Sequence, residues 1–368
     1  MNFSFNLPVR IVSGTHCIQK SADLLCVGES ALIVTGKNGA KMSGALDDVT
    51  AALKSHGVEY TVFDRITENP PLEVCFDGGR LAADVGADFI IGIGGGSALD
   101  AAKAIAAFAA NQHISAMDIF SAEKRTNTSL PIIAIPTTSG TGSEANPYSV
   151  LSLPGGEKKK TFSAPDSWAK LAFLDGRYTY SLSREQTLST ALDAFAHAIE
   201  SFLSPRSTQV SEMMALFAAA NIWDTIKDDP DEYTEEMHDV LLCASCAAGI
   251  AISVTGTGFP HPLGYSITML DGIPHGAACA LFEGDYIAYN MSTPIGKAKL
   301  LDFADALDTT VDSLISRLPQ LSGVDLSFTE EEIEKRVELI ADAKNYSNSP
   351  YVLSKDEMYD IYRSHFLA

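Results

Sequence analysis

One carboxylate and three histidines in the C-terminal half could together bind a divalent metal ion. Asp193 and His197 are four residues apart in LSTALDAFAHAIES, so they share one face of a predicted helix. His261 follows in GFPHPLGY, and His275 comes fourteen residues later in GIPHGAA. Such a nitrogen and oxygen donor set suits Fe²⁺ or Zn²⁺, and a catalytic site would keep one position open for substrate. The residue types favour a metal site over the alternative of separate core or surface histidines.

Glu200 lies one turn after His197 on the same predicted helix. It could contact one of the metal ligands without binding the metal itself. Its position alone favours an ordinary surface acid, and that is the expectation here.

A glycine-rich turn in the N-terminal half could bind the phosphates of a nucleotide. In DFIIGIGGGSALDAAKAIA an apolar strand runs into Gly94, Gly95, Gly96 and Ser97, and a helix begins at once. Glycines let the backbone approach an anion, and the N–H groups and dipole of the helix start favour negative charge. Asp100 lies in the first turn, where an acid suits a helix start with or without a ligand. The spacing is not G-x-G-x-x-G and no acid follows about 20 residues later, so the standard dinucleotide fingerprint is not met.

A second polar loop, IPTTSGTGSE, follows the next predicted strand. It contains five hydroxyl side chains: Thr137, Thr138, Ser139, Thr141 and Ser143. In an open α/β sheet, ligands bind at the carboxyl ends of the strands. A solvated surface loop is the alternative, but the glycine-rich turn just before it favours a nucleotide cleft.

The two halves of the chain have different patterns. Short apolar runs alternate with helical stretches up to about residue 175, which predicts a parallel sheet covered on both faces. The predicted strands are 31–36, 60–64, 88–95 and 130–137, and the predicted helices are 43–57, 70–86 and 98–110. Long helical segments follow from Ser183 to Ala368. We expect a Rossmann-like α/β nucleotide-binding domain over residues 1–179 and an all-α metal-binding domain over residues 180–368.

Composition limits the partners and the compartment. Lys and Arg number 26 against 47 Asp and Glu, a net charge of −21 that disfavours nucleic acid and anionic membranes as partners. We find no apolar run of about 18 residues and no signal-peptide pattern in MNFSFNLPVR, so we expect a cytoplasmic protein. Six cysteines show no disulfide framework, and Cys243 and Cys246 are interpreted as two small core residues rather than a redox or metal pair.

Four motifs together resemble the iron-containing (group III) alcohol dehydrogenases, and most closely their NADP-binding bacterial members. The motifs are GGGSxxDxAK, PTTxGTGSE, DAxxHAIE and PHG, in order, in a likeness that extends from about Phe5 to the C-terminus. The resemblance implies two domains with the active site between them, and a homodimer or larger homo-oligomer. It also implies an Fe²⁺ site, with Zn²⁺ as the alternative, at Asp193, His197, His261 and His275.

The same resemblance assigns cofactor contacts. The pyrophosphate and nicotinamide ribose would be lined by Gly94, Gly95, Gly96, Ser97 and Asp100. The phosphates and the adenine side would be contacted by Thr137, Thr138 and Thr141, and the nicotinamide end would lie near Ser143. Lys159 stands at the position of the family's cofactor-contacting lysine. Because Lys158 and Lys160 flank it, the alignment of this position is uncertain by one residue. Gly36 stands where NAD-preferring relatives carry an Asp that would repel a 2′-phosphate, so NADP(H) is favoured over NAD(H).

One departure from the family pattern concerns proton transfer. Tyr265 stands where many relatives have a second histidine, four residues after His261, so no protein base is assigned. Phe162, Phe259 and Tyr265 suggest a small, partly apolar substrate, with core packing as an equal alternative.

The implied function is a metal-dependent alcohol dehydrogenase or aldehyde reductase that transfers a hydride between NAD(P)H and a small aldehyde or alcohol. The alternatives are a glycerol dehydrogenase-like or dehydroquinate synthase-like enzyme, or a non-catalytic metal- or nucleotide-binding relative.

Overall fold

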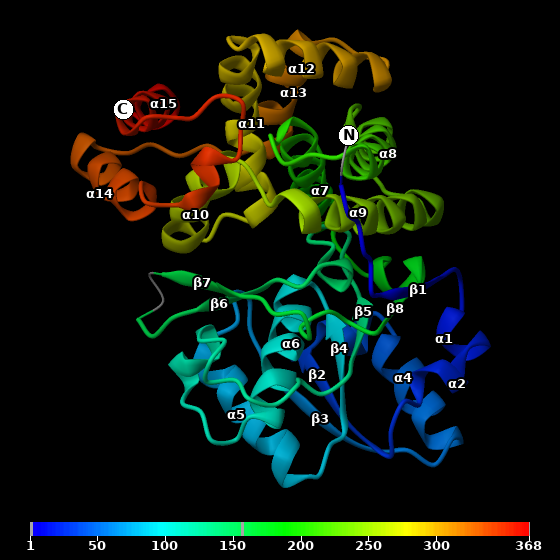
Figure 1. The fold of residues 1–368 in the computed structure, drawn as a ribbon. Helices are drawn as coiled ribbons and strands as arrows, with labels where there is room; N and C mark the ends of the chain where they lie inside the picture. Colours follow the sequence, from blue (N-terminus) through cyan, green and yellow to red (C-terminus); the bar gives the residue numbers. More distant parts are fainter. Residues whose placement is uncertain (1–2, 156–157, 368) are drawn as a thin grey trace. The chain divides into compact units, whose positions relative to one another are not determined.

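The computed structural model describes residues 3–155 and 158–367 (Figure 1). Its contacts divide the chain into two compact units. The α/β unit comprises Asn6–Leu182 and Thr234–Cys246, and the helical unit comprises Ser183–Tyr233 and the residues from Ala247 on, together with the start of the chain.

A six-stranded sheet with all pairings parallel forms the centre of the α/β unit, as predicted (Figure 1). Its order is β1-β8-β5-β4-β2-β3. The strands are β1 (Arg10–Ser13), β2 (Ser30–Gly36), β3 (Glu59–Ile66), β4 (Phe89–Gly94), β5 (Ile132–Pro136) and β8 (Leu171–Leu174). A separate antiparallel pair consists of β6 (Ser149–Ser152) and β7 (Lys159–Phe162). The four strands predicted from the sequence are β2 to β5; the four-residue strands were not predicted.

Apolar side chains on both faces of the sheet explain the continuous apolar runs in its strands. Leu32 and Val34 of β2 belong to a core with the helices at Leu72–Asp84 (α5) and Gly96–Ala110 (α6), whereas Ile33 faces a second core with the helices at Cys17–Lys20 (α1), Gly39–Met42 (α3) and Ala45–Ser55 (α4). Because strand residues alternate between faces, a strand buried on both sides is apolar throughout. The helices of this unit are α1 (Cys17–Lys20), α2 (Ala22–Leu25), α3 (Gly39–Met42), α4 (Ala45–Ser55), α5 (Leu72–Asp84) and α6 (Gly96–Ala110), with 3₁₀ turns η1 (Ala116–Phe120), η2 (Ser143–Ala145) and η3 (Gly176–Thr179).

The helical unit begins at a well-defined helix start. Ser183 accepts a hydrogen bond from the backbone N–H of Gln186, whose side chain accepts one from Ser183 N–H in return. The helices are α7 (Arg184–Leu203), α8 (Gln209–Ile226), α10 (Pro260–Asp271), α11 (His275–Met291), α12 (Pro294–Ala306), α13 (Val311–Ser322), α14 (Glu330–Ile340) and α15 (Lys355–Phe366), with the 3₁₀ turn η4 (Lys344–Ser347). Helix α9 (Glu235–Thr255) is shared between the two units. The predicted helical character of the C-terminal half is confirmed.

The expectation that no apolar stretch reaches about 18 residues was wrong: among the residues the structure describes, helix α9 is the one helix long and apolar enough to cross a membrane. However, 67% of its apolar stretch is buried inside the protein. A core helix of a soluble protein has the same properties, so this is weak evidence for a membrane span.

Candidate functional site

Three helices of the helical unit bring the four predicted metal ligands together. Asp193 and His197 lie one turn apart on α7, His261 lies in the first turn of α10, and His275 begins α11. Oδ1 of Asp193 is 3.8 Å from Nε2 of His197, 3.7 Å from Nε2 of His261 and 3.8 Å from Nε2 of His275. One carboxylate oxygen therefore faces three imidazole nitrogens.

The separations in this cluster fit a shared metal ion better than hydrogen bonds. Asp193 and His261 are 4% and 3% exposed, and neither Oδ1 of Asp193 nor Nε2 of His261 makes a hydrogen bond. A buried polar atom without a partner is costly, so such a pair points to a missing ligand. Atoms bound to one tetrahedral Zn²⁺ at ordinary N and O bond lengths lie about 3.3–3.6 Å apart. The residues present thus fit a divalent ion.

Charge at the cluster favours a cation there. Burial opposes ionisation of Asp193, but the neighbouring imidazoles outweigh it and hold the pKa of this carboxyl well below its usual range. Burial also lowers the pKa of His261, yet the carboxylates of Glu200 and Asp193 outweigh it and raise this pKa to about 10. The carboxylates of Glu200 and Asp193 thus favour positive charge at this position.

Glu200 is not a surface acid, and that expectation was wrong. Its side chain is fully buried, and Oε1 and Oε2 accept from Nδ1 of His261 at 2.7 and 2.9 Å. Oε2 also accepts from Gly258 N–H. Since Nδ1 of His261 contacts Glu200, Nε2 is the nitrogen that faces Asp193. Gly258 contacts Glu200 through its backbone N–H, so its residue type gave no sign of the contact. The helical spacing of Glu200 shows which face of α7 it occupies, but not whether other elements bury that face.

A second buried acid, Glu283, stands behind Glu200. It is 1% exposed, and burial together with the Glu200 charge raises the pKa of its carboxyl well above the usual value. This residue was not predicted from the sequence. An acid directly after the apolar run AACALF was the available signal.

The aromatic residues predicted near the substrate lie in three different settings. The ring of Tyr265 stacks on His275, with centroids 5.7 Å apart. Phe259 packs edge-on against Tyr286 in the helical unit, and Phe162 belongs to the core of the α/β unit. Of the three, Tyr265 borders the metal-ligand cluster.

The glycine-rich turn lies where the topology of the sheet places a ligand. β4 ends at Gly94 between β5 and β2, and the chain crosses to opposite sides after β2 and after β4. Such a switch point at the carboxyl ends of the strands is the ligand-binding position of open α/β sheets. Gly94 has φ +150°, and Gly95, the N-cap residue of α6, offers no side chain to the first N–H groups of that helix. These N–H groups can therefore serve an anion.

The two predicted cofactor loops pack directly on each other. Thr137 N–H donates to Gly94 O at 3.0 Å. A Cβ added at Gly95 would lie 3.0 Å from Thr138 Oγ1, and one added at Gly96 would lie 2.5 Å from Thr141 Cγ2. Glycine is therefore required at 96 by close approach, and the two loops lie against each other in the fold.

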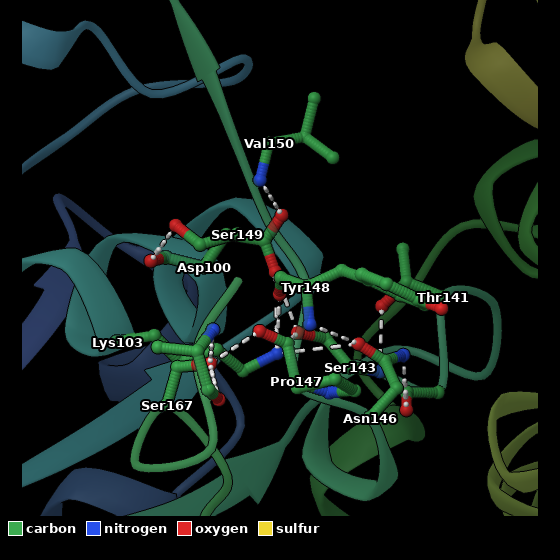
Figure 2. Close-up of polar contacts among 12 residues, drawn as sticks. Asp100, Lys103, Thr141, Ser143, Asn146, Pro147, Tyr148, Ser149, Val150 and Ser167 are labelled. Carbon is green, nitrogen blue, oxygen red and sulfur yellow. Dashed lines mark hydrogen bonds and ion pairs between the residues drawn. The ribbon is translucent and has the colours of Figure 1, made fainter. Parts of the chain in front are cut away.

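Asp100 and Ser143, from the two loops, meet over a buried lysine that was not predicted from the sequence (Figure 2). Lys103 Nζ donates to Ser143 Oγ and to Tyr148 O, both at 2.6 Å. Ser143 Oγ donates to Asp100 Oδ1 at 2.6 Å, and Val150 N–H donates to Asp100 Oδ2 at 2.8 Å. Burial lowers the pKa of Lys103 to about 8 despite the attraction of Asp100. A lysine in the apolar, alanine-rich α6 was the sequence signal for this cluster.

The remaining predicted cofactor residues lie at the edges of these elements. Gly36 ends β2, and a Cβ added there would lie 3.2 Å from Ile66 O. Lys159 begins β7 and is half-buried, whereas Lys158 and Lys160 are exposed. Ser97 Oγ accepts from Asn69 N–H at 3.1 Å.

The cysteine expectation holds only in part. Cys246 is buried, but Cys243 is exposed, with its sulfur 3.7 Å from Ser13 Oγ, so the interpretation of both as core residues was wrong for Cys243. All six cysteines lie in the described part of the chain, and none is in a disulfide there.

Comparison with known proteins decides the family. A family model described as iron-containing alcohol dehydrogenase matches residues 8–176, and one described as the C-terminal part of the Fe-containing alcohol dehydrogenase family matches residues 187–366. The chain belongs to the iron-containing alcohol dehydrogenase family. The resemblance drawn from the four motifs is confirmed, and so is the expected fold class. Membership makes the chain an NAD(P)-dependent oxidoreductase of the alcohol dehydrogenase type.

Relatives in this family match over nearly the full chain. A "Sulfoacetaldehyde reductase" from Bilophila wadsworthia is 30% identical and an "NADPH-dependent butanol dehydrogenase" from Clostridium saccharobutylicum is 29% identical; the alignments cover 98% and 97% of this chain and 98% and 96% of the relatives. A crystal structure of an iron-containing alcohol dehydrogenase from Thermotoga maritima matches with a TM-score of 0.91 and 33% identity, covering 99% of both chains.

Proposed function

We propose that this chain interconverts small aldehydes and alcohols with NADP(H), using an Fe²⁺ ion held by Asp193, His197, His261 and His275, with Zn²⁺ as the alternative metal. The observation that carries the proposal is the buried Oδ1 of Asp193, which makes no hydrogen bond yet lies 3.7–3.8 Å from three imidazole nitrogens. A site that needed no ligand would satisfy this oxygen within the protein.

The bound ion would supply an electrophile that polarises the substrate oxygen. The protein residues set how strong that electrophile is. Asp193 brings the single negative charge of this ligand set, so a divalent ion keeps net positive charge. Glu200 fixes the tautomer and orientation of His261. Burial of both groups keeps water away and strengthens every electrostatic interaction at the site.

The α/β unit would bind the cofactor at the carboxyl edge of its sheet. We assign the pyrophosphate and nicotinamide ribose to the turn at Gly94–Ser97 and to Asp100, and the phosphates and adenine side to Thr137, Thr138 and Thr141, with Ser143 at the nicotinamide end and Lys159 as the contacting lysine. The N–H groups at the start of α6 and the close packing of the two loops support this assignment. We likewise assign cofactor binding to residues 1–179 and metal binding to residues 180–368.

NADP(H) is the proposed cofactor because β2 ends in glycine. An acid at Gly36 would hydrogen-bond the ribose hydroxyls and repel a 2′-phosphate, whereas glycine brings no charge. The close approach of Ile66 O to this position further restricts any side chain there.

Tyr265 is a poor candidate for the proton-transferring base. Burial raises the pKa of its phenol well above the usual value, with the charges of Glu200 and Asp193 acting in the same direction. The phenol therefore stays protonated at neutral pH. We assign proton exchange to the ribose hydroxyls of the cofactor and to water.

The proposed setting is a cytoplasmic homodimer or larger homo-oligomer, with no nucleic acid or membrane partner. The net charge of −21 supports the last part, because it repels anionic surfaces. Light scattering of the purified chain measures the oligomer directly.

The test is a steady-state assay of full-length protein loaded anaerobically with Fe²⁺ or Zn²⁺. NADPH and NADH oxidation would be followed with a series of short aldehydes, beside a chelator-treated control. We expect turnover that is lost with the chelator and is faster with NADPH. Turnover that survives metal removal would contradict the proposed mechanism, and a preference for NADH would contradict the argument from Gly36.

A further inference from the structure

A buried thiol, that of Cys279, lies beside the metal-ligand cluster. Cys279 is fully buried on α11, one turn after His275, so both side chains project from one face of that helix. Its sulfur is 3.7 Å from Nε2 of His275 and 3.9 Å from Nδ1. The nearer nitrogen is the one that faces Asp193.

The sulfur forms one group of donor atoms with three of the four metal-ligand candidates, and His197 is not part of this group. One donor atom each from Asp193, His261, His275 and Cys279 lie within 4.8 Å of one another. A sulfur and a nitrogen that share one Zn²⁺ through bonds of about 2.3 and 2.0–2.1 Å can lie about 3.6 Å apart. The separation of 3.7 Å between Cys279 and His275 is close to that value.

Two further atoms point to a ligand in the same space. Oδ1 of Asp193 and Nε2 of His261 are buried and make no hydrogen bond. Cys279 is thus not an isolated thiol but one of four donors, two of which lack a hydrogen bond. Cys75 illustrates the contrast: it is equally buried, but within the apolar core of the α/β unit.

We propose that Cys279 is a ligand of the metal ion in this chain, bound through its sulfur as a thiolate. The inference rests on the proposed metal site and deepens it. On binding, the thiol proton is released to solvent and the sulfur donates to the ion. The thiolate would add a second negative charge to that of Asp193, so the ion would be a weaker electrophile than with Asp193 as its single anionic ligand. A soft sulfur ligand shifts the preference of the site toward Zn²⁺ and Co²⁺ over ions that favour oxygen, such as Mg²⁺ and Mn²⁺.

Cobalt substitution tests this directly. Co²⁺ would be added to metal-free, full-length protein under anaerobic conditions and absorption recorded from the near-ultraviolet to the red. Visible d–d bands report that Co²⁺ is bound in a site of low coordination number. An intense near-ultraviolet charge-transfer band reports a thiolate on the cobalt. We expect both sets of bands to saturate together at one Co²⁺ per chain.

Variants assign the sulfur. Cys279→Ser and Cys279→Ala should lose the charge-transfer band and keep d–d bands, and their Zn²⁺ dissociation constant, measured against a competing chelator, should rise at least tenfold. Cys243→Ser is the matched control, because Cys243 is exposed and lies in the other unit. It should leave both spectra and the dissociation constant unchanged.

The outcomes separate this inference from the proposed function. Visible bands without a charge-transfer band in the native protein would overturn the role of Cys279 and leave the metal site standing, even if both Cys279 variants failed to fold. A charge-transfer band that persists in Cys279→Ser would also overturn it, since another cysteine would be the ligand. No visible bands at all would contradict the metal site itself, and the inference with it.

Discussion

Two buried polar clusters of this chain, one in each unit, differ in how far their atoms are satisfied. In the α/β unit, Lys103 donates to Ser143 and Tyr148, and Asp100 accepts from Ser143 and Val150 (Figure 2). In the helical unit, Asp193 and His261 each keep a buried atom with no hydrogen bond. Both clusters bury an aspartate near nitrogen donors, but only in the first are both carboxylate oxygens of that aspartate hydrogen-bonded from within the protein.

This difference separates a scaffold from a binding site. The hydrogen bonds of Lys103 and Asp100 fix the loop that follows β5 against α6. Oδ1 of Asp193 and Nε2 of His261, which are buried without hydrogen bonds, cost folding free energy unless an ion binds them. Removing the charge of Lys103 should therefore lower the free energy of unfolding, and removing the charge of Asp193 should weaken metal binding.

Asp193→Asn should have the largest effect. It replaces the carboxylate that faces all three imidazoles with a neutral amide, and we expect turnover to fall by roughly a thousandfold or more, since a bound metal contributes several kcal/mol to the transition state. Bound iron per chain should fall with it, while NADPH binding followed by fluorescence stays unchanged. Asp285→Asn is the matched control, because Asp285 is not among the metal-ligand candidates. Its Oδ2 lies 2.7 Å from Nε2 of His365. Normal iron content in Asp193→Asn would contradict the assignment.

Lys103→Met should show the opposite profile. It leaves Asp100 buried without its cation, which costs about 3–5 kcal/mol of unfolding free energy for a broken buried pair. Urea unfolding in a Trp223→Phe background reads the α/β unit alone, because Trp168 then remains as the single tryptophan and lies in that unit. The exposed Lys170→Met serves as control. Unchanged unfolding in Lys103→Met, with iron content also normal, would remove the distinction between the two clusters.

Glu144→Gln should sharpen the account of the α/β cluster through its pH dependence. Burial raises the pKa of Glu144 to about 7, from an ordinary value of 4.5. Between these values the folded chain keeps a proton that the unfolded chain has released, so stability falls as pH rises and stays lower above pH 7. The pKa difference corresponds to at most about 3 kcal/mol. The free energy of unfolding of Glu144→Gln, minus that of the parent, should therefore increase from about pH 5 to about pH 7.5. The same difference between variant and parent at both pH values would refute this.

Glu200→Gln should give the smallest of the four effects. The amide keeps the size of the side chain but loses the charge that holds Nδ1–H of His261, and groups of this kind contribute about 10–100-fold to metal affinity. Zn²⁺ competition against a chelator measures it. Glu212→Gln, which removes the partner of Lys299 in the same unit, should leave the affinity unchanged. Native affinity in Glu200→Gln would show that this carboxylate does not orient His261.

The order and type of the main elements could be predicted from the sequence because their patterns are strong. Strands β2, β4 and β5 are continuous apolar runs, and α6 is a long alanine-rich segment that follows glycines. The short strands β1 and β8 were missed, since four residues carry too little periodicity and their pairing is set by distant partners.

The site was predictable by residue type but not by contact. Asp193 and His197 share a helix face at a spacing that any helix imposes. Cys279 stands at the same spacing from His275, yet a thiol in an apolar helix is more often a core residue. Glu200 needed the contact with His261, sixty-one residues away, and Lys103 needed a loop forty residues later. Such tertiary partners have no local sequence signal.

The most direct test of the central claim is a titration of metal-free protein with Fe²⁺ under anaerobic conditions, with aldehyde-dependent NADPH oxidation recorded at each addition. The account predicts negligible initial activity, a linear rise that ends at one Fe²⁺ per chain, and no rise in Asp193→Asn. Activity in the metal-free protein equal to that of the loaded protein would contradict it.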